Sequence, residues 1–265
     1  MDPSNPYCVI PARYMSTRFP GKPLVPLLGK PMVLWVAEAC SRAMGRDQVV
    51  IATDDERIAA VASDAQFHVE ITSAEAATGT DRVAEVVAKL GGQTVLNVQG
   101  DEPLVSPEDI RAIAEFHATH PQFVVNGYTP VSTSEDARRL TIPKVVLDLS
   151  ENLLYASRAA IPGSKSTSLS SDITFLKQVC IYAYTPSQLA AFSARCEKTP
   201  LEASEDIEIL RFLEMGQAVR MVKTEVSSFA VDEPQDVKQA ERLMRKMGRR
   251  AINFPRTPSN IAGET

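Results

Sequence analysis

Short apolar runs alternate with helical patterns over the first 130 residues. The apolar runs lie at 7–10, 48–52, 67–71, 94–98 and 123–128. Between them, apolar residues recur at helical spacing from Pro31, around Ile58, along 83–90 and after Pro107. Continuous apolar runs are typical of strands covered on both faces. Strands that alternate with helices predict an α/β protein with a parallel, doubly wound sheet.

The pattern changes after residue 130. Two strands joined by a tight polar turn are predicted at 144–149 and 152–157, and a third at 176–184. The segment 163–172 is rich in Ser and Lys and is predicted to be a loop. This stretch has the pattern of an antiparallel insertion, which suits binding of a second substrate or dimerisation. One helix at 202–215, a strand at 219–222 and a final helix ending near Met247 are expected to follow.

Polar clusters follow the predicted strands where each strand ends. They lie at 11–22, 53–55, 78–82 and 99–103. Parallel α/β sheets bind ligands beyond the carboxyl ends of their strands. The sequence therefore predicts a ligand site at this edge of the sheet.

The first of these clusters is a rigid basic loop. It carries Arg13, Arg18 and Lys22 beside two prolines and a glycine, which exclude regular structure and fix the backbone. A strand that opens into such a loop before a helix is typical of phosphate binding. Arg13 and Lys22 are the better candidates because the flanking prolines hold them in place. The alternative is a solvated loop with scattered charges.

Two common phosphate-binding motifs are not found in this sequence. Gly29-Lys30 is followed by Pro31 instead of the Ser or Thr of a P-loop, and no G-x-G-x-x-G follows a predicted strand. These patterns argue against a P-loop ATPase and a dinucleotide-dependent dehydrogenase. The sequence also lacks a nucleophile elbow and a histidine in a triad-like setting. Phosphoryl or nucleotidyl transfer, which depends on positioning and charge neutralisation, is favoured.

Two aspartates are candidate metal ligands. Asp101 follows a fully apolar strand at the ligand edge, where a carboxylate suits Mg²⁺ together with phosphate oxygens. Asp232 precedes Pro234 and could complete the site. Each could instead cap a helix or a turn, and spacing alone leaves both interpretations of Asp232 open.

Composition narrows the class of partner. The net charge of -5 and pI near 5.4 argue against nucleic-acid binding. No apolar run approaches the ~20 residues of a membrane span, and residues 1–6 do not resemble a signal peptide. The four cysteines form no C-x-x-C pair and are expected to be reduced thiols. A cytoplasmic protein is expected.

Several motifs, in order along residues 7–247, resemble those of the CMP-Kdo synthetases (3-deoxy-manno-octulosonate cytidylyltransferases; the sugar acid is abbreviated Kdo). They are Pro11-Ala12-Arg13, Ser16-Thr17-Arg18, Pro20-Gly21-Lys22-Pro23-Leu24, Ala52-Thr53-Asp54, Gly79-Thr80-Asp81-Arg82, Asn97-Val98-Gln99-Gly100-Asp101-Glu102-Pro103, Pro143-Lys144-Val145-Val146, Tyr155 with Ser157-Arg158, Ile181-Tyr182-Ala183-Tyr184, Pro200-Leu201-Glu202 and Val231-Asp232.

The resemblance implies an enzyme that couples CTP to an acidic sugar, giving a CMP-sugar and pyrophosphate with Mg²⁺. It also implies a Rossmann-like nucleotidyltransferase fold, mostly parallel, with an antiparallel insertion for dimerisation and acceptor binding. Residues 1–130 would bind CTP. Residues 131–247 would bind the acceptor, form a homodimer and return to the main sheet. The tail, 248–265, is expected to be poorly ordered.

The resemblance assigns candidate site residues by position. Catalysis falls to Lys22, Arg13 and Asp101, and the metal to Asp101 and Asp232. The nucleotide-binding set is Pro11, Ala12, Arg13, Ser16, Lys22, Thr78, Thr80, Arg82 and Gln99. The acceptor-binding set is Arg158, Gln178, Tyr182, Glu205 and Glu208.

The sequence departs from the family pattern mainly on the acceptor side. Gln178 replaces a usual His, Ile209 replaces a usual Gln, and 162–165 replaces Pro-Trp-Asp-Arg. The closing Asp-Thr-Pro-Glu-Asp is also altered, to Asp232-Glu233-Pro234-Gln235-Asp236.

These departures leave the acceptor open. Kdo is the default, and 8-amino-Kdo, another ulosonic acid or a small carboxylated phosphonate such as phosphonoformate are alternatives. A non-catalytic nucleotide-binding protein is a further alternative, against which the retained Asp101 and Asp232 argue.

Overall fold

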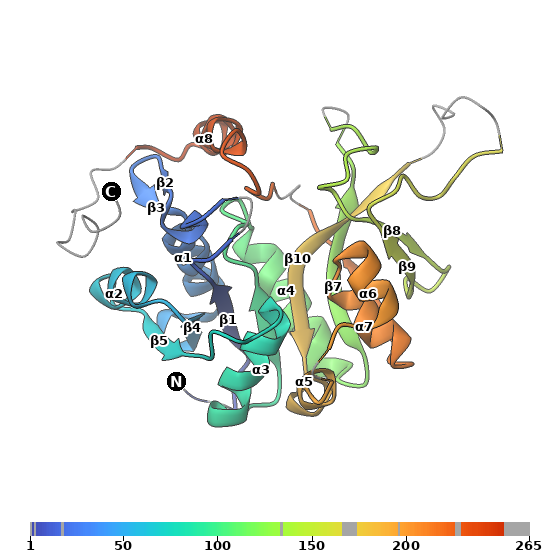
Figure 1. Cartoon of the computed structure of the whole chain (residues 1–265), viewed down its shortest axis with the longest axis horizontal. Coiled ribbons are helices and arrows are strands. Elements are labelled where there is room, and N and C mark those ends of the chain that lie inside the picture. The colour runs from blue at the N-terminus through green and yellow to red at the C-terminus, as the bar shows by residue number, and fades with distance from the viewer. Residues whose placement is uncertain are drawn as a thin grey trace.

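A long central sheet organises the chain in the computed structural model, which describes residues 2, 4–16, 19–132, 135–165, 174–195, 197–225 and 229–251. The strand order is β11-β7-β10-β6-β1-β4-β5, and β8 and β9 continue from β10 (Figure 1). The main strands are β1 (Tyr7–Ala12), β4 (Val49–Thr53), β5 (His68–Ile71), β6 (Val95–Val98), β7 (Val124–Pro130), β10 (Leu176–Tyr184) and β11 (Val219–Lys223).

The predicted parallel strands are confirmed. β1 pairs in parallel with both β4 and β6, β4 with β5, and β7 with β11. The alternation along β1 separates two cores. Cys8 and Ile10 pack with α1 (Met32–Met44), α2 (Glu56–Asp64) and α4 (Pro107–Thr119). Tyr7 and Val9 pack with α3 (Gly79–Leu90), α5 (Pro186–Ser193) and α7 (Ile209–Glu214).

The position of β10 differs from the prediction. This strand was expected within the insertion, but it lies inside the main sheet, antiparallel to both β6 and β7. It is mostly buried because helices cover both faces and strands pair with both edges. The fold is therefore a mostly parallel sheet with one antiparallel strand near its middle.

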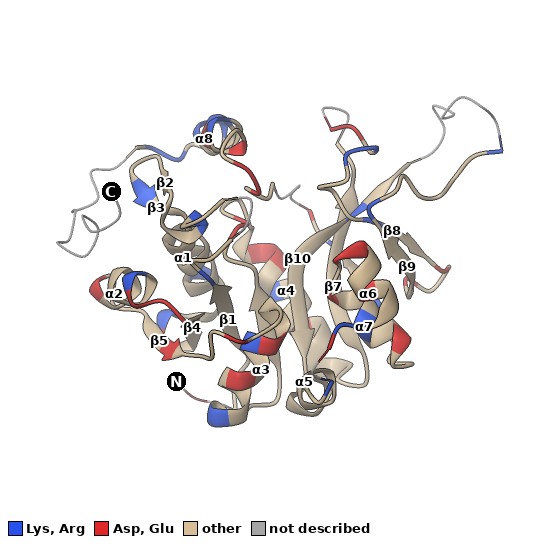
Figure 2. Cartoon of the chain, viewed as in Figure 1, with Lys and Arg blue, Asp and Glu red and all other residues tan. Residues whose placement is uncertain are grey.

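The predicted hairpin is confirmed, with shorter strands. β8 (Lys144–Leu147) and β9 (Leu153–Ser157) pair antiparallel, and β8 also pairs with the start of β10. Most of the predicted loop at 163–172 and of the tail at 248–265 lies outside the described residues. Figure 2 shows the charged residues mainly on the helices and loops around the sheet.

The helix predicted at 202–215 is two helices. α6 (Pro200–Glu205) ends where Asp206 adopts a left-handed conformation at φ 52°, and α7 begins at Ile209. Apolar spacing continues across this break, so periodicity did not reveal it. Aspartate is one of the residues that tolerates the left-handed region.

The remaining elements are short or peripheral. They are the 3₁₀ turns η1 (Lys22–Leu24) and η2 (Arg46–Gln48), the strands β2 (Pro26–Leu27) and β3 (Lys30–Pro31), and the helix α8 (Asp236–Lys246). Gln48 was predicted to begin a strand but closes η2, and Pro31 is the residue before α1. Within the described ranges, no helix combines the length and apolar character that crossing a membrane requires.

Candidate active site

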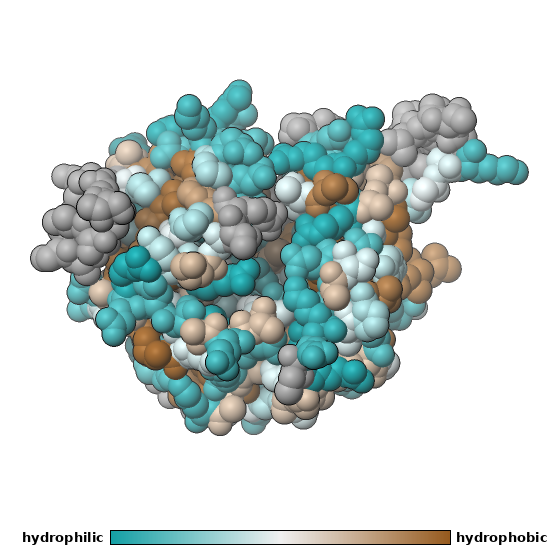
Figure 3. Space-filling model, viewed as in Figure 1, coloured by the Kyte–Doolittle hydropathy of each residue, from teal (hydrophilic) through white to brown (hydrophobic). Residues whose placement is uncertain are grey.

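A pocket of about 290 Å³ opens at the carboxyl edge of the parallel strands. One wall comes from the loop after β1, the start of α3 and the end of β6. The opposite wall comes from 135–143, Arg158, the first half of β10 and 206–208, and we call it the acceptor wall after the role expected for Arg158 and Gln178. The segment 229–236 closes one side. Figure 3 shows a hollow between these two halves, with hydrophilic residues around it.

The loop after β1 supplies the basic side of the pocket. Pro11, Ala12, Arg13, Ser16 and Lys22 all line it, as the sequence predicted for a phosphate-binding loop. The loop closes on itself because the Gly21 N–H donates to the carbonyl of Tyr14 at 2.8 Å. Gly21 has φ 70°, a conformation that L residues rarely adopt. Arg18 lies outside the described residues.

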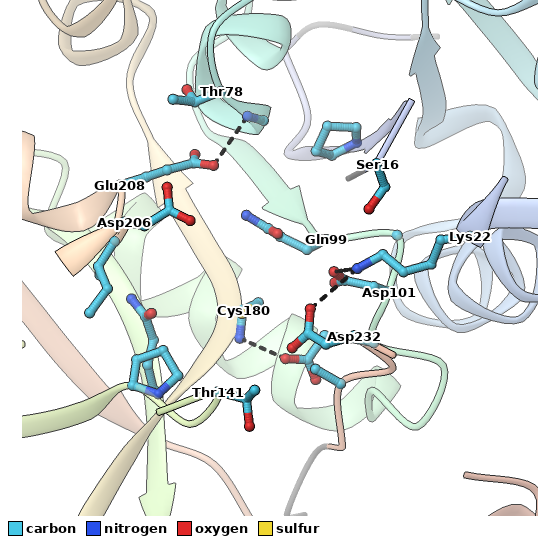
Figure 4. A pocket seen from close by; sticks show the side chains of 18 of the residues that line it. Ser16, Lys22, Thr78, Gln99, Asp101, Thr141, Cys180, Asp206, Glu208 and Asp232 are labelled. Atoms are coloured by element: carbon cyan, nitrogen blue, oxygen red, sulfur yellow. Dashed lines mark hydrogen bonds and ion pairs between the residues drawn. The ribbon is translucent and has the colours of Figure 1, made fainter. Parts of the chain in front are cut away.

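Lys22 lies between the two candidate metal ligands (Figure 4). Its Nζ is 2.6 Å from Asp101 Oδ2 and 3.4 Å from Asp232 Oδ1. Burial lowers the pKa of Lys22, but the two carboxylates more than offset this effect, so the pKa is raised overall and the side chain carries its charge. The fold thus brings together two carboxylates that are distant in sequence.

Backbone hydrogen bonds hold the two aspartates in place. The Val231 N–H donates to the carbonyl of Asp101 at 3.0 Å, which fixes the segment of Asp232 against the end of β6. The buried carboxylate of Asp236 accepts the N–H groups of Asp232 and Glu233 at 3.0 and 2.9 Å. Both metal candidates are therefore positioned before any ligand binds.

The donor set fits a hard divalent cation. Mg²⁺ prefers oxygen ligands and is usually held by one or two carboxylates together with substrate phosphates. Asp101 and Asp232 provide two such carboxylates beside the basic loop. Among the described residues there is no cluster of three or more His, Cys, Asp or Glu that could hold a metal. A cation here would therefore share its remaining positions with phosphate oxygens and water.

The nucleotide-binding candidates divide into two layers. Thr78, Arg82 and Gln99 line the pocket. Thr80 is 1% exposed and lies beneath it, where its hydroxyl accepts a hydrogen bond from Asn97 Nδ2 at 3.3 Å. Arg82 is itself almost fully buried and its guanidinium lies 3.5 Å from the Asp54 carboxylate, while Thr53 pairs with Ala12 of β1.

Glu208 is bound to the start of α3. Its carboxylate accepts the N–H groups of Gly79 at 3.1 Å and Thr80 at 2.8 Å, two of the unpaired amides of the first helical turn. Burial raises the pKa of Glu208, an effect that these hydrogen bonds oppose. Glu208 lines the pocket and joins the segment 206–208 on one wall to the start of α3 on the other.

Arg158 lies on the acceptor wall and Glu205 behind it. The Arg158 guanidinium donates to the carbonyls of Leu140, Glu205 and Asp206 at 2.9, 2.5 and 2.8 Å. The Glu205 carboxylate accepts from the Ser157 hydroxyl at 2.6 Å and from the Arg158 N–H at 2.8 Å. Glu205 is not among the residues that line the pocket, so it supports Arg158 from outside.

A bulge in β10 positions Gln178. The pairing of β10 with β7 shifts between Val179 and Tyr182. The buried amide of Asn126 fills the irregularity by donating to the carbonyls of Val179 and Ile181 at 2.8 and 2.9 Å. Asn126 Oδ1 in turn accepts from Gln178 Nε2 at 2.8 Å, which leaves the amide oxygen of Gln178 for other partners. Gln178 and Tyr182 both line the pocket.

The expectation that Ile209 belongs to the acceptor side is wrong. Its side chain is 1% exposed and packs in the core beneath α3 and α5. It opens α7, and the turn of that helix directs it into the core while Glu208 faces the pocket.

Sequence reasoning missed several charged residues of the pocket, among them Glu102, Glu135, Arg139, Lys177 and Asp236. Lys177 is 2.6 Å from Glu135 across the acceptor wall, and Arg139 reaches Asp236 at 3.9 Å. Glu102 is buried, and its Oε2 has no hydrogen-bond partner among the described residues. Burial and the neighbouring Asp101 raise the pKa of Glu102 to about 7. Its place directly after Asp101 was the available signal, whereas the Lys177–Glu135 pair had none.

A basic loop at the end of a strand, two carboxylates beside it and a second wall facing them define the class of protein, a nucleotidyltransferase. Comparison with known proteins gives the family. The family model described as cytidylyltransferase matches residues 7–224. The chain therefore belongs to the cytidylyltransferases, and it is an enzyme of the CMP-transferring type.

Curated relatives match almost end to end. A 3-deoxy-manno-octulosonate cytidylyltransferase from Syntrophotalea carbinolica is 41% identical over 244 residues, which cover 89% of this chain and 97% of the relative. An 8-amino-3,8-dideoxy-manno-octulosonate cytidylyltransferase from Shewanella frigidimarina is 39% identical over 242 residues, covering 88% and 96%. The resemblance to the CMP-Kdo synthetases is thus confirmed.

Solved structures confirm the fold. A CMP:2-keto-3-deoxy-manno-octonic acid synthetase complexed with CTP superposes with a TM-score of 0.81 at 32% identity, covering 92% of this chain and all of that chain. An inositol-1-phosphate CTP transferase from T. maritima has a TM-score of 0.68 at 13% identity, which shows a shared fold alone.

Proposed function

We propose that this enzyme couples CTP to Kdo in the presence of Mg²⁺, giving CMP-Kdo and pyrophosphate. The observation that carries the proposal is that one pocket contains both the Lys22–Asp101–Asp232 cluster and the Arg158–Gln178 wall. The names of the curated relatives and the CTP complex of the similar synthetase support the two substrates.

The reaction joins a hydroxyl oxygen of the acceptor to the α-phosphorus of CTP. The new O–P bond forms as the bond from the α-phosphorus to the bridging oxygen breaks, and pyrophosphate leaves with that electron pair. The hydroxyl proton passes to solvent. Arg13 and Lys22 neutralise charge on the triphosphate, and Thr78, Arg82 and Gln99 hold the nucleoside. Asp101 and Asp232 would hold Mg²⁺, which would supply further charge neutralisation.

The second candidate is the same transfer to 8-amino-Kdo. It is favoured by several relatives with that name at 37–39% identity. Gln178 occupies the position of the usual His. Its amide oxygen accepts no hydrogen bond from the residues that the structure describes, so it can accept one from a hydroxyl or an ammonium group. A wrong partner there costs about 1–3 kcal/mol, enough to favour one sugar several-fold or more.

The remaining expectations concern assembly and location. We propose a homodimer that forms through the β8–β9 hairpin, where Leu149 and Leu154 are 107% and 61% exposed. Light scattering should report twice the mass of the chain, and Leu154→Glu should shift it toward the monomer. A monomeric wild type would contradict this proposal. A cytoplasmic location follows from the substrates, and cell fractionation tests it.

The deciding experiment measures pyrophosphate release from CTP with Kdo, 8-amino-Kdo and phosphonoformate, with Mg²⁺ and with EDTA. We expect Mg²⁺-dependent release with Kdo or 8-amino-Kdo, and the larger kcat/KM identifies the acceptor. Release with phosphonoformate alone would overturn the sugar assignment. CTP binding without release from any acceptor would favour a non-catalytic nucleotide-binding protein.

A further inference from the structure

The acceptor wall is built around a lysine that does not reach the pocket. Lys144 begins β8 and is 0% exposed. Its Nζ donates to the backbone carbonyls of Arg139, Ile142 and Arg158 at 2.9, 2.5 and 2.5 Å. An ammonium group has three N–H donors, so this group is completely satisfied by main-chain oxygens.

Each of those carbonyls belongs to a residue that lines the pocket. Arg139, Ile142 and Arg158 all contribute to the acceptor wall. Arg158 extends the pattern, because its guanidinium donates to three further carbonyls, those of Leu140, Glu205 and Asp206. Two adjacent cations therefore collect six carbonyls from 139–142, 158 and 205–206, the segments that form this wall.

The arrangement depends on the charge of the lysine. A neutral amine has two N–H groups and would leave one of the three carbonyls unpaired in a buried place, which is unfavourable. Burial, with the nearby Arg158 guanidinium, lowers the pKa of Lys144 to about 8, and the carboxylates of Glu205 and Asp136 oppose that effect. Burial makes the charged form of Lys144 unfavourable, yet this charged form is the one that holds the acceptor wall together. This indicates that the geometry of the wall matters.

We propose that Lys144 is a positioning residue for the acceptor, because its buried ammonium fixes 139–142 against Arg158 and so shapes the acceptor wall. This inference rests on the proposed function for its kinetic readout. The nucleotide loop lies on the opposite wall, and within the described part of the chain no hydrogen bond joins it to the Lys144 ammonium. Loss of Lys144 should therefore affect the acceptor far more than CTP.

The test compares Lys144→Met with a matched control, Lys30→Met. Lys30 is also a buried lysine, at 6% exposure, but its Nζ pairs with Glu38 at 2.5 Å outside the pocket. Lys144→Met should raise the KM for the sugar acceptor at least tenfold with the Kd for CTP within twofold. Lys30→Met should leave both within twofold. Lys144→Gln, whose amide keeps two N–H donors, should give an intermediate KM.

The pH dependence of the acceptor KM and hydrogen exchange of the wall are two further tests of the role of Lys144. The wild-type KM for the acceptor should rise above about pH 8, where Lys144 loses its proton. Hydrogen exchange at 139–142 and 156–159 should accelerate in Lys144→Met and not in Lys30→Met, whatever the acceptor is. If Lys144→Met proves too unstable to purify, Lys144→Gln and the pH profile decide.

An unchanged acceptor KM in Lys144→Met, or an equal weakening of CTP binding, would overturn the positioning role. A wild type inactive with every sugar overturns the proposed function instead. The exchange measurement then decides the role of Lys144, and unchanged exchange at 139–142 rejects it.

Discussion

Replacing Arg211 with Met should destabilise the fold by about 3–5 kcal/mol, the typical cost of removing one partner from a buried ion pair. Arg211 is 1% exposed and Glu202 is 0% exposed. Arg211 Nε and Nη2 donate to the two oxygens of Glu202 at 2.6 and 2.7 Å. Nη1 lies 3.3 Å from Asp81 and from the carbonyl of Phe192, and the guanidinium stacks 3.7 Å above the Phe192 ring.

The size of the effect follows from what remains after the substitution. Methionine fills most of the volume, so the loss is electrostatic. Within the described ranges, the one hydrogen bond left to the Glu202 carboxylate comes from the Thr199 N–H at 3.2 Å. With a shift of about 2–4 °C per kcal/mol for a chain of this size, the melting temperature should fall by roughly 6–20 °C. CTP binding should weaken several-fold, because Asp81 also accepts the hydroxyl hydrogen bond of Thr78 at 2.7 Å.

The assay is urea unfolding followed by circular dichroism, with a second variant as the control. Arg211→Met with Glu202→Met removes both charges and should be at least about 2 kcal/mol more stable than Arg211→Met alone. A cost below about 1 kcal/mol for the single variant, or a double variant no more stable than the single one, would refute this reasoning.

Three further predictions concern the site and the core. Asp101→Asn should lower kcat for pyrophosphate release at least about 100-fold, because it removes one of the two carboxylates proposed to bind Mg²⁺. Burial lowers the pKa of His117 to about 4, below the ~6.5 of an unfolded chain, so stability should fall by about 3 kcal/mol as pH drops from about 6.5 to about 4. Gly92→Ala should cost at least about 1–3 kcal/mol, because Gly92 has φ +130° and a Cβ would lie 2.7 Å from the Tyr7 ring.

Each of these predictions has its own check. Turnover that survives undiminished in Asp101→Asn means that the metal assignment is wrong. Urea titrations at several pH values should show a weaker acid dependence in His117→Gln, and an identical dependence excludes His117 as its source. Gly163→Ala is the control for Gly92, since nothing lies within 4 Å of its Cβ position. Equal melting temperatures for the two alanine variants would contradict the steric argument.

The sequence predicted where the strands and most helices lie along the chain better than it predicted which strands pair with each other. The apolar run at 176–184 was recognised as a strand, but an apolar run has the same composition whichever way it pairs. Only the hydrogen bonds with β6 and β7 reveal that it runs against its neighbours in the main sheet. The helix α5 also escaped prediction, although Thr185 and Gln188 form a capping box at its start.

In the site, too, the sequence predicted which residues matter better than which residues they contact. The position of Asp101 directly after a strand was enough to predict that it lies at the ligand edge. The sequence did not show that Asp232 lies beside it, because a tertiary hydrogen bond between Val231 and Asp101 brings the two segments together. Glu205 and Arg158 were both expected at the acceptor, yet packing places Glu205 behind Arg158. Spacing along a chain does not encode which of two adjacent polar side chains is nearer the cavity.

The direction of β10 has a consequence for how acceptor choice can change. The excursion from the main sheet leaves at the end of β7 and returns at the start of β10, where Leu176 pairs with Pro130 and the Val131 N–H donates to the Phe175 carbonyl at 2.8 Å. The two ends of the segment 131–175 are neighbours. The segment could therefore be replaced as a unit while the main sheet keeps its strands and their order. Exchanging this segment between two relatives would replace much of the acceptor wall. The loop after β1 would remain that of the recipient protein.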